Sequence, residues 1–170
     1  MAKPDGPDRS AWIATLLKRY ESPLVSYALR ITGDVETARD VVQETFVRLC
    51  MERAELNGNH VAAWLFTVCR RRALDVRRKE SRMQALTEAT IETRESVEPG
   101  PEALVDRRDD ATRADALLAD LPENQREVVR LKFGAGLSYK EIAEVTGLSV
   151  GNVGFLLHTA IRTLRARMTE

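Results

Sequence analysis

A short stretch of the sequence concentrates basic side chains: Arg70, Arg71, Arg72, Arg77, Arg78 and Lys79. Guanidinium and ammonium groups at this density bind nucleic-acid phosphates through their charge and their several N–H donors. Asp75 lies among them and favours an alternative, in which ion pairs three and four residues apart stabilise an exposed Arg-rich helix. We predict that this stretch binds phosphate groups.

A second candidate surface is predicted on the preceding helix, from Asp34 to about Arg53. At 100° per residue, its apolar face consists of Val35, Ala38, Val41, Val42, Thr45, Phe46 and Leu49. The opposite face carries Asp40, Gln43, Glu44, Val47 and Arg48. A charged face is often only solvated surface, but an exposed valine with a polar rim is typical of a protein-binding site. We therefore predict that this face binds a partner protein.

Residues 139–156 fit the pattern of a helix-turn-helix. Small Ala143 is placed where the two helices cross, and Gly147 at the turn, where a positive φ suits glycine. Ser149 is positioned to cap the second helix. The predicted buried positions are Ile142, Leu148, Val153 and Leu156. An ordinary αα-hairpin is the alternative, but the register of these residues favours a DNA-binding motif.

The second helix of this motif has an unusual composition for a DNA reader. Its first half carries Gly151, Asn152, Gly154 and Phe155, and no Arg or Lys precedes Arg162. Base edges and phosphates are normally contacted by Arg, Lys, Asn or Gln from this half. The predicted DNA-contacting residues are therefore Lys140, Ser149, Asn152, His158, Thr159, Arg162 and Arg165.

Helical periodicity predicts the elements that position these residues. The first domain, residues 10–81, is expected to hold helices at Ser10–Ile31 (broken at Pro23), Asp34–Arg53 and Val61–Ser81, with Asp34 as an N-cap. Residues 82–112 are predicted to form a flexible acidic linker that contains Pro99, Gly100 and Pro101. The second domain, residues 113–168, is expected to hold helices at Ala111–Leu121, Gln125–Phe133, Tyr139–Thr146 and Val150–Met168. The predicted fold class is all-α, in two small domains.

Composition argues against several classes of protein. The 170 residues include 26 basic and 26 acidic side chains, so no net charge directs the chain to nucleic acid or to a membrane. Two cysteines and two histidines lack metal-ligand spacing, which argues against a zinc site or a disulfide scaffold. No signal peptide or membrane span is predicted, so we expect a cytoplasmic protein. The sequence lacks a Gly-rich phosphate loop and a nucleophile–histidine pair; we expect no enzymatic activity, metal, cofactor or small-molecule substrate.

Taken together, these segments resemble a bacterial RNA polymerase sigma factor of the sigma-70 family, of the extracytoplasmic-function (ECF, group IV) type. In the first domain the resemblance rests on DVVQETF at residues 40–46, AWLF at 63–66, RRRALD at 70–75 and RR at 77–78. In the second domain it rests on LP at 121–122, REVV at 126–129 and LSYKEIA at 137–143. These motifs occur in the family's order and at its separations.

The resemblance implies a function for each surface. The helix with Asp40, Gln43, Glu44, Val47 and Arg48 would dock on the clamp coiled coil of core RNA polymerase. The stretch from Arg70 to Lys79 would recognise and melt the −10 element of promoter DNA. The helix-turn-helix would read the −35 element, and an anti-sigma factor would hold the protein inactive.

Two departures from the family pattern bear on DNA recognition. The family usually has Asn at the position of Arg71, and basic residues at the positions of Gly154, Leu156 and Thr159. Two alternatives to a sigma factor stay open. The first is a stand-alone helix-turn-helix transcriptional regulator, and the second is a protein-binding regulator that lost promoter recognition.

Overall fold

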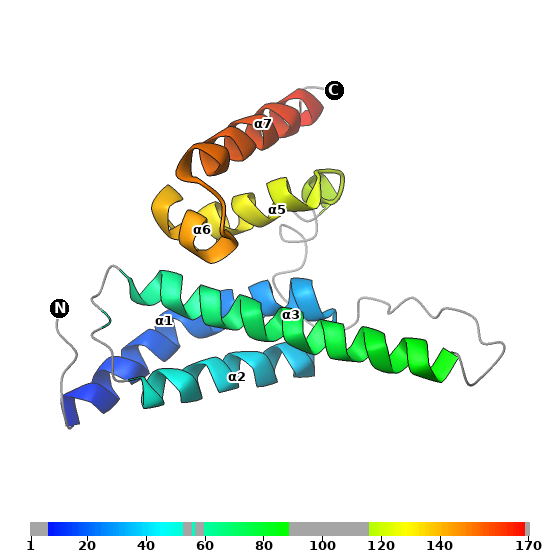
Figure 1. Cartoon of the computed structure of the whole chain (residues 1–170). Coiled ribbons are helices and arrows are strands. Elements are labelled where there is room, and N and C mark those ends of the chain that lie inside the picture. The colour runs from blue at the N-terminus through cyan, green and yellow to red at the C-terminus, as the bar shows by residue number, and fades with distance from the viewer. Residues whose placement is uncertain (1–6, 53–55, 57–59, 89–115, 169–170) are drawn as a thin grey trace. The chain divides into compact units, whose positions relative to one another are not determined.

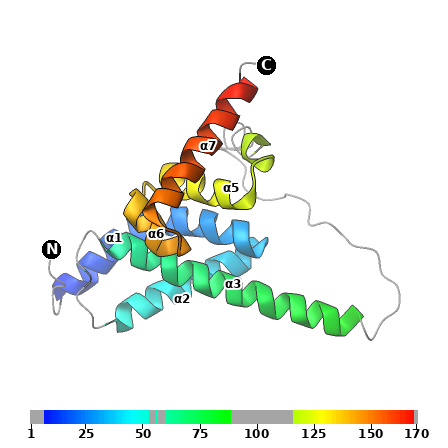
Figure 2. The ribbon, with the colours of Figure 1, turned by 45° about the horizontal axis from the view of Figure 1, so that its top comes forward.

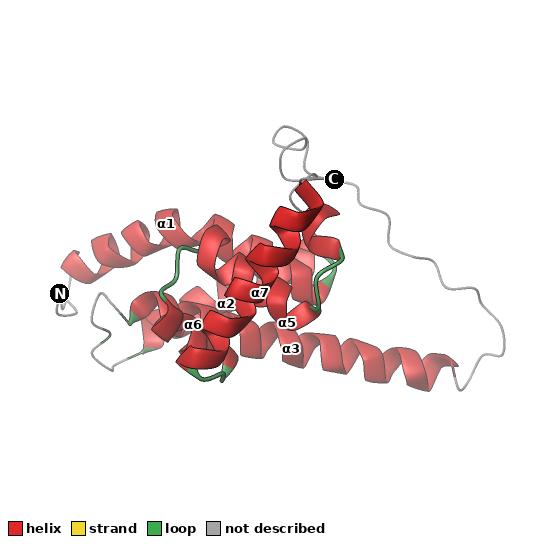
Figure 3. Ribbon diagram, turned by 90° about the horizontal axis from the view of Figure 1, so that it is seen from above, coloured by secondary structure: helices red, strands yellow, loops and turns green. Residues whose placement is uncertain are grey.

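A computed structural model describes residues 7–52, 56, 60–88 and 116–168 of the chain (Figure 1). The chain divides into two compact units, which separate between Glu98 and Pro99. Every regular element in these described ranges is helical, as Figure 3 shows by colour. The predicted all-α fold in two helical units is therefore confirmed.

The first unit is a three-helix bundle of α1 (Pro7–Thr32), α2 (Val35–Met51) and α3 (Val61–Glu88), in which each helix packs on the other two. Its centre holds Leu24 and Leu49 together with Leu65 and Phe66 of α3, all at most 1% exposed. The rings of Tyr27 and Phe66 meet edge to face, with their centroids 5.5 Å apart. This buried cluster fixes α3 against the other two helices.

The predicted break at Pro23 is wrong, because α1 runs through it without interruption. A proline inside a helix removes one backbone hydrogen bond and costs about 3 kcal/mol. Tyr20, Leu24 and Tyr27 lie on both sides of it and are at most 7% exposed. Burying such side chains stabilises by about 1.5–3 kcal/mol each, which outweighs the proline.

Two side chains fix the ends of α2. The Asp34 carboxylate accepts hydrogen bonds from the Thr37 backbone N–H (2.8 Å) and hydroxyl (2.7 Å), so its predicted role as N-cap is confirmed. At the other end, Arg9 donates to the carbonyls of Cys50 (2.5 Å) and Glu52 (3.0 Å). These bonds satisfy carbonyls that the end of a helix leaves free.

The third helix extends further than the sequence predicted. It ends at Glu88 instead of Ser81, and its second half projects beyond α1 and α2 (Figures 1 and 2). The added residues are mostly strong helix formers, so the helix continues although residues 82–87 are exposed. Residues 89–112 of the predicted linker lie outside the described residues.

The second unit contains a helical turn at residues 116–119, then α5 (Glu123–Val129), a π-helical turn η1 (Arg130–Gly134), α6 (Tyr139–Thr146) and α7 (Val150–Met168). The helix predicted at Gln125–Phe133 is thus α-helical first and π-helical at its end. Residues 111–115 lie outside the described ranges. The core side chains are Leu131, Leu137, Ile142, Val153 and Leu157, all at most 2% exposed.

Candidate functional site

The outward side of α2 matches the predicted partner-binding face. We call Asp40, Gln43, Glu44, Val47 and Arg48 the α2 outer face. Asp40, Gln43 and Arg48 are exposed, and Val47 at their centre is 47% exposed. The opposite side of the helix is buried as predicted, except that Val35 is half-buried. The structure thus presents an apolar side chain with a polar rim.

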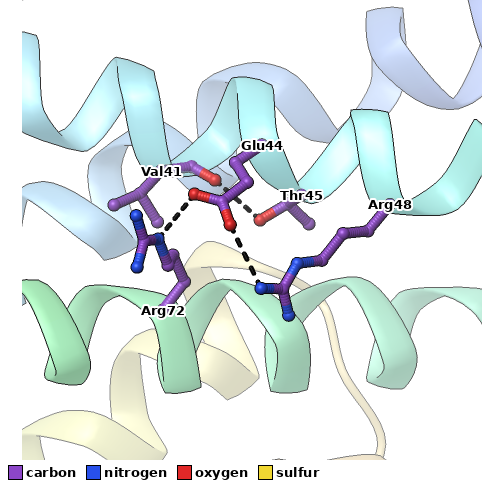
Figure 4. Close-up of polar contacts among 5 residues, drawn as sticks. All are labelled: Val41, Glu44, Thr45, Arg48 and Arg72. Atoms are coloured by element: carbon purple, nitrogen blue, oxygen red, sulfur yellow. Dashed lines mark hydrogen bonds and ion pairs between the residues drawn. The ribbon is translucent and has the colours of Figure 1, made fainter.

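Glu44 differs from the rest of this face because it joins α2 to α3 (Figure 4). Its Oε2 atom lies 2.5 Å from Nε of Arg72, and its Oε1 atom lies 3.1 Å from Nη2 of Arg48. All three side chains are partly exposed, with relative exposures of 31% for Arg72, 35% for Glu44 and 55% for Arg48. The carboxylate therefore orients one guanidinium on each helix.

The basic side chains of α3 fall into two groups. We call the six residues the basic stretch: Arg70, Arg71, Arg72, Arg77, Arg78 and Lys79. Arg70 and Arg72 are half-buried, whereas the other four are exposed. Arg78 lies 3.7 Å from Asp75, so part of the predicted stabilisation by Asp75 is present. Both side chains of this pair are more than half exposed, and such pairs contribute little stability. The exposed guanidinium groups remain accessible to phosphates.

Two titratable groups near these surfaces are structural. Burial raises the pKa of the Cys69 thiol to about 12, so Cys69 is protonated at neutral pH and unsuited to nucleophilic chemistry. The hydrogen bonds from Thr37 lower the pKa of Asp34 below its usual value, which favours the charged form of the cap. Neither group points to catalysis.

The turn between α6 and α7 has the geometry predicted for a helix-turn-helix. Gly147 ends α6 in the left-handed region, with φ of 75°. The Ser149 hydroxyl accepts a hydrogen bond from the Asn152 N–H at 3.1 Å and so caps α7. Ile142, Val153 and Leu156 are buried as predicted, whereas Leu148 and Ala143 are half-buried. Ser138 caps α6 through a reciprocal pair of bonds with Glu141.

The predicted DNA-contacting residues of this unit do not form one cluster. Asn152 and His158 lie exposed in the first half of α7, and Thr159 is half-buried. Arg162 and Arg165 are exposed about one to two turns further on. Lys140 is exposed near the start of α6, and Ser149 is exposed at the cap.

Phe155 lies among other apolar residues of α7: Val153, Leu156 and Leu157. Those three neighbours are buried, but Phe155 is 66% exposed. Phe133 in η1 is exposed to the same extent. Helical phase could have separated Phe155 from the core residues, because it lies 100° from Leu156 and 160° from Val153 at 100° per residue.

Metal-binding clusters and membrane-spanning helices are both absent from the described residues. In the part of the chain that the structure describes, no group of His, Cys, Asp and Glu side chains is arranged to hold a metal ion. Within the same residues, no helix is long and apolar enough to cross a membrane.

Comparisons with known proteins identify the two units. The family model for Sigma-70 region 2 matches residues 16–83, and the model for Sigma-70, region 4 matches residues 112–164. The ECF RNA polymerase sigma factor SigL of Mycobacterium tuberculosis is 34% identical over 164 residues, which cover 95% of this chain and 91% of SigL. The RNA polymerase sigma factor YlaC of Bacillus subtilis is 28% identical over 167 residues, covering 93% and 92% of the two chains.

Two solved structures share the fold. RpoE of Bartonella quintana, solved in complex with the anti-sigma factor NepR, superposes with a TM-score of 0.67 at 22% identity, over 94% of this chain and 98% of that one. CnrH, solved in complex with the cytosolic domain of CnrY, gives a TM-score of 0.61 at 24% identity, over 96% and 90%. The sequence matches and the family models together show that the chain belongs to the ECF RNA polymerase sigma factors of the sigma-70 family.

Proposed function

We propose that this sigma factor divides its work among three surfaces: the α2 outer face binds core RNA polymerase, the basic stretch of α3 binds and opens the −10 element, and the helix-turn-helix reads the −35 element. A sigma factor binds core polymerase and directs it to promoters, so the assignment concerns which residues do so. The observation that carries it is the Glu44–Arg72 contact, which fixes the α2 outer face beside the basic stretch.

The case for docking through α2 rests on its chemistry. Val47 offers apolar area at the centre, and Asp40, Gln43 and Arg48 surround it with groups that form directional bonds. Protein interfaces combine these features, with the polar rim fixing the register of the partner. Because Glu44 is already held by two arginines, Asp40 is the cleaner position at which to test docking.

The case for promoter opening through α3 rests on charge and shape. Melting exposes single strands, which proteins hold with basic grooves and stacking groups. Arg71, Arg77, Arg78 and Lys79 are exposed along a helix that extends past the bundle. A guanidinium at position 71, where the family usually has Asn, offers stacking and phosphate contacts instead of amide hydrogen bonds.

The proposal also covers regulation and location. RpoE, which has a similar fold, was solved in complex with the anti-sigma factor NepR. CnrH, which also has a similar fold, was solved in complex with the cytosolic domain of CnrY. We infer that an anti-sigma factor likewise holds this chain inactive. We also place it in the bacterial cytoplasm, where core polymerase and promoter DNA are found.

The docking assignment is tested by gel filtration with bacterial core RNA polymerase. Asp40→Arg places a cation in the rim, and we expect the affinity for core polymerase to fall by at least about a hundredfold, because like-charge contacts at an interface cost several kcal/mol. Glu21→Arg makes the same change of charge at an exposed position of α1 and should co-elute like the wild type. Equal affinity of both variants would contradict docking through α2.

The DNA assignment is tested with a quadruple variant in which Arg70, Arg71, Arg77 and Arg78 are replaced by Glu. We expect this variant to co-elute with core polymerase but to leave promoter thymines unreactive to permanganate, since strand opening needs these cations. Lys18→Glu with Arg19→Glu, both exposed on α1, controls for added negative charge. Normal opening by the quadruple variant would contradict the assignment.

A further inference from the structure

The outward side of α7 carries an aromatic ring where a DNA-reading helix is expected to carry hydrogen-bonding groups. At 100° per residue, Gly151, Phe155, His158 and Arg162 lie within an arc of about 60°. Phe155 is the second residue of this row and is 66% exposed. In a helix-turn-helix, this half of the second helix enters the major groove and contacts base edges.

The orientation of this row is fixed by the packing of the helix. Val153 and Leu157 are at most 1% exposed, which holds the opposite side of α7 in the core of the unit. A Cβ atom at Gly154 would lie 3.6 Å from the ring of Tyr139, so α6 packs closely along this flank. Phe155 therefore cannot turn inward without displacing the core.

The surroundings of the ring suit a DNA duplex. A Cβ atom at Gly151 would meet nothing within 4 Å, so one turn before Phe155 the backbone itself is open to a close approach. Asn152 is exposed beside this position, and Lys140 is exposed near the start of α6. An exposed ring with an amide one turn away offers apolar and hydrogen-bonding contacts to base edges.

The residue types then restrict which bases can be read. No Arg or Lys occurs from Val150 to Ile161, and Arg162 begins about 18 Å along the helix at 1.5 Å per residue. The bidentate contact of Arg or Lys with guanine is therefore missing from the half of α7 that enters the groove. Phe contacts the C5-methyl group of thymine, and Asn forms paired hydrogen bonds with adenine.

We propose that this sigma factor reads A·T base pairs in its −35 element, with Phe155 packed on a thymine methyl group and Asn152 bonded to an adenine. The inference rests on the proposed function, because it requires the helix-turn-helix to lie on promoter DNA. Specificity then comes from apolar and amide contacts, while phosphate contacts supply affinity.

The experiment uses holoenzyme reconstituted from the full chain and bacterial core polymerase. Duplexes with a randomised −35 element are selected for binding, and each thymine of the selected element is then replaced by deoxyuridine, which lacks only the methyl group. Burying one methyl group contributes a factor of about four in affinity. We expect wild-type holoenzyme to lose about this factor at one or two positions, and Phe155→Ala holoenzyme to bind the thymine and uracil forms equally.

Phe133→Ala is the matched control, because it removes a ring of the same 66% exposure from η1 in the same unit. This variant should keep the wild-type preference for thymine. Circular dichroism and co-elution with core polymerase check the fold and assembly of each variant.

Three outcomes would overturn the inference. Selection of guanine-containing elements with no preference for thymine over uracil would show that α7 reads other bases. Loss of core binding by Phe155→Ala, with an unchanged circular dichroism spectrum, would show that the ring contacts core polymerase. Failure of the wild type to co-elute with core polymerase would overturn the proposed function as well, whereas the first two outcomes leave that function intact.

Discussion

The two helices assigned to DNA, α3 and α7, differ in charge and in how they are held. The basic stretch places six cations on α3, whereas α7 has none before Arg162. The α3 helix is fixed by two neighbouring helices and a large buried ring, and α7 by a small core and a tight turn. Charge binds phosphates regardless of sequence, whereas groove-facing groups distinguish bases. Under the proposed function, the first unit would supply affinity and strand opening, and the second unit would supply selectivity.

The largest predicted effect is a loss of stability on removing the buried ring that holds α3 in its bundle. Phe66→Ala removes a fully buried side chain that contacts Tyr27, and we expect a loss of about 3–5 kcal/mol in the free energy of unfolding. Urea unfolding followed by circular dichroism measures it. Leu157→Ala, at the core of the second unit, should cost about 2–5 kcal/mol. A negligible loss for Phe66→Ala would mean that α3 is held in another way.

A smaller effect is expected at the turn that sets the angle of α7. Gly147 has φ of 75°, which costs other residues about 1–2 kcal/mol, so Gly147→Ala should destabilise the second unit by this amount. Thermal unfolding measures the change. Gly151→Ala, in a helix and with open space at the Cβ position, should not destabilise. Equal effects at both positions would contradict the role given to the turn.

The smallest effect concerns pH and the cap of α2. The pKa of Asp34 is lowered in the folded state, so its stabilising contribution is complete above the unfolded value of 3.8 and is lost as the pH falls through the lower folded value. Asp34→Asn keeps an acceptor but does not titrate there. We expect the wild type to lose more stability than this variant between pH 5 and 2, as measured by thermal unfolding. Parallel curves would contradict the prediction.

The features that were predicted from sequence are local ones. The caps Asp34 and Ser149, the turn at Gly147 and the bounds of α6 and α7 all depend on residues within a few positions of one another. Each of these is encoded by propensity and hydrogen bonding along one helix, and the structure confirms them.

The features that were missed depend on packing between helices. Pro23 is tolerated because neighbouring side chains of α1 are buried against α2 and α3. Phe66 is fully buried, where its ring meets Tyr27 of α1. The Glu44–Arg72 contact joins residues 28 positions apart, and helical periodicity carries no information about which helices are neighbours.

The central claim, that α3 supplies charge and α7 supplies selectivity, is tested most directly by the salt dependence of holoenzyme binding to a selected promoter. Each lost phosphate contact reduces the slope of log affinity against log salt by about 0.7–0.9. Replacing Arg70, Arg71, Arg77 and Arg78 by Gln should therefore reduce the slope by about 3, whereas Phe155→Ala should lower affinity and leave the slope unchanged. An unchanged slope for the Gln variant, or a reduced slope for Phe155→Ala, would contradict the claim.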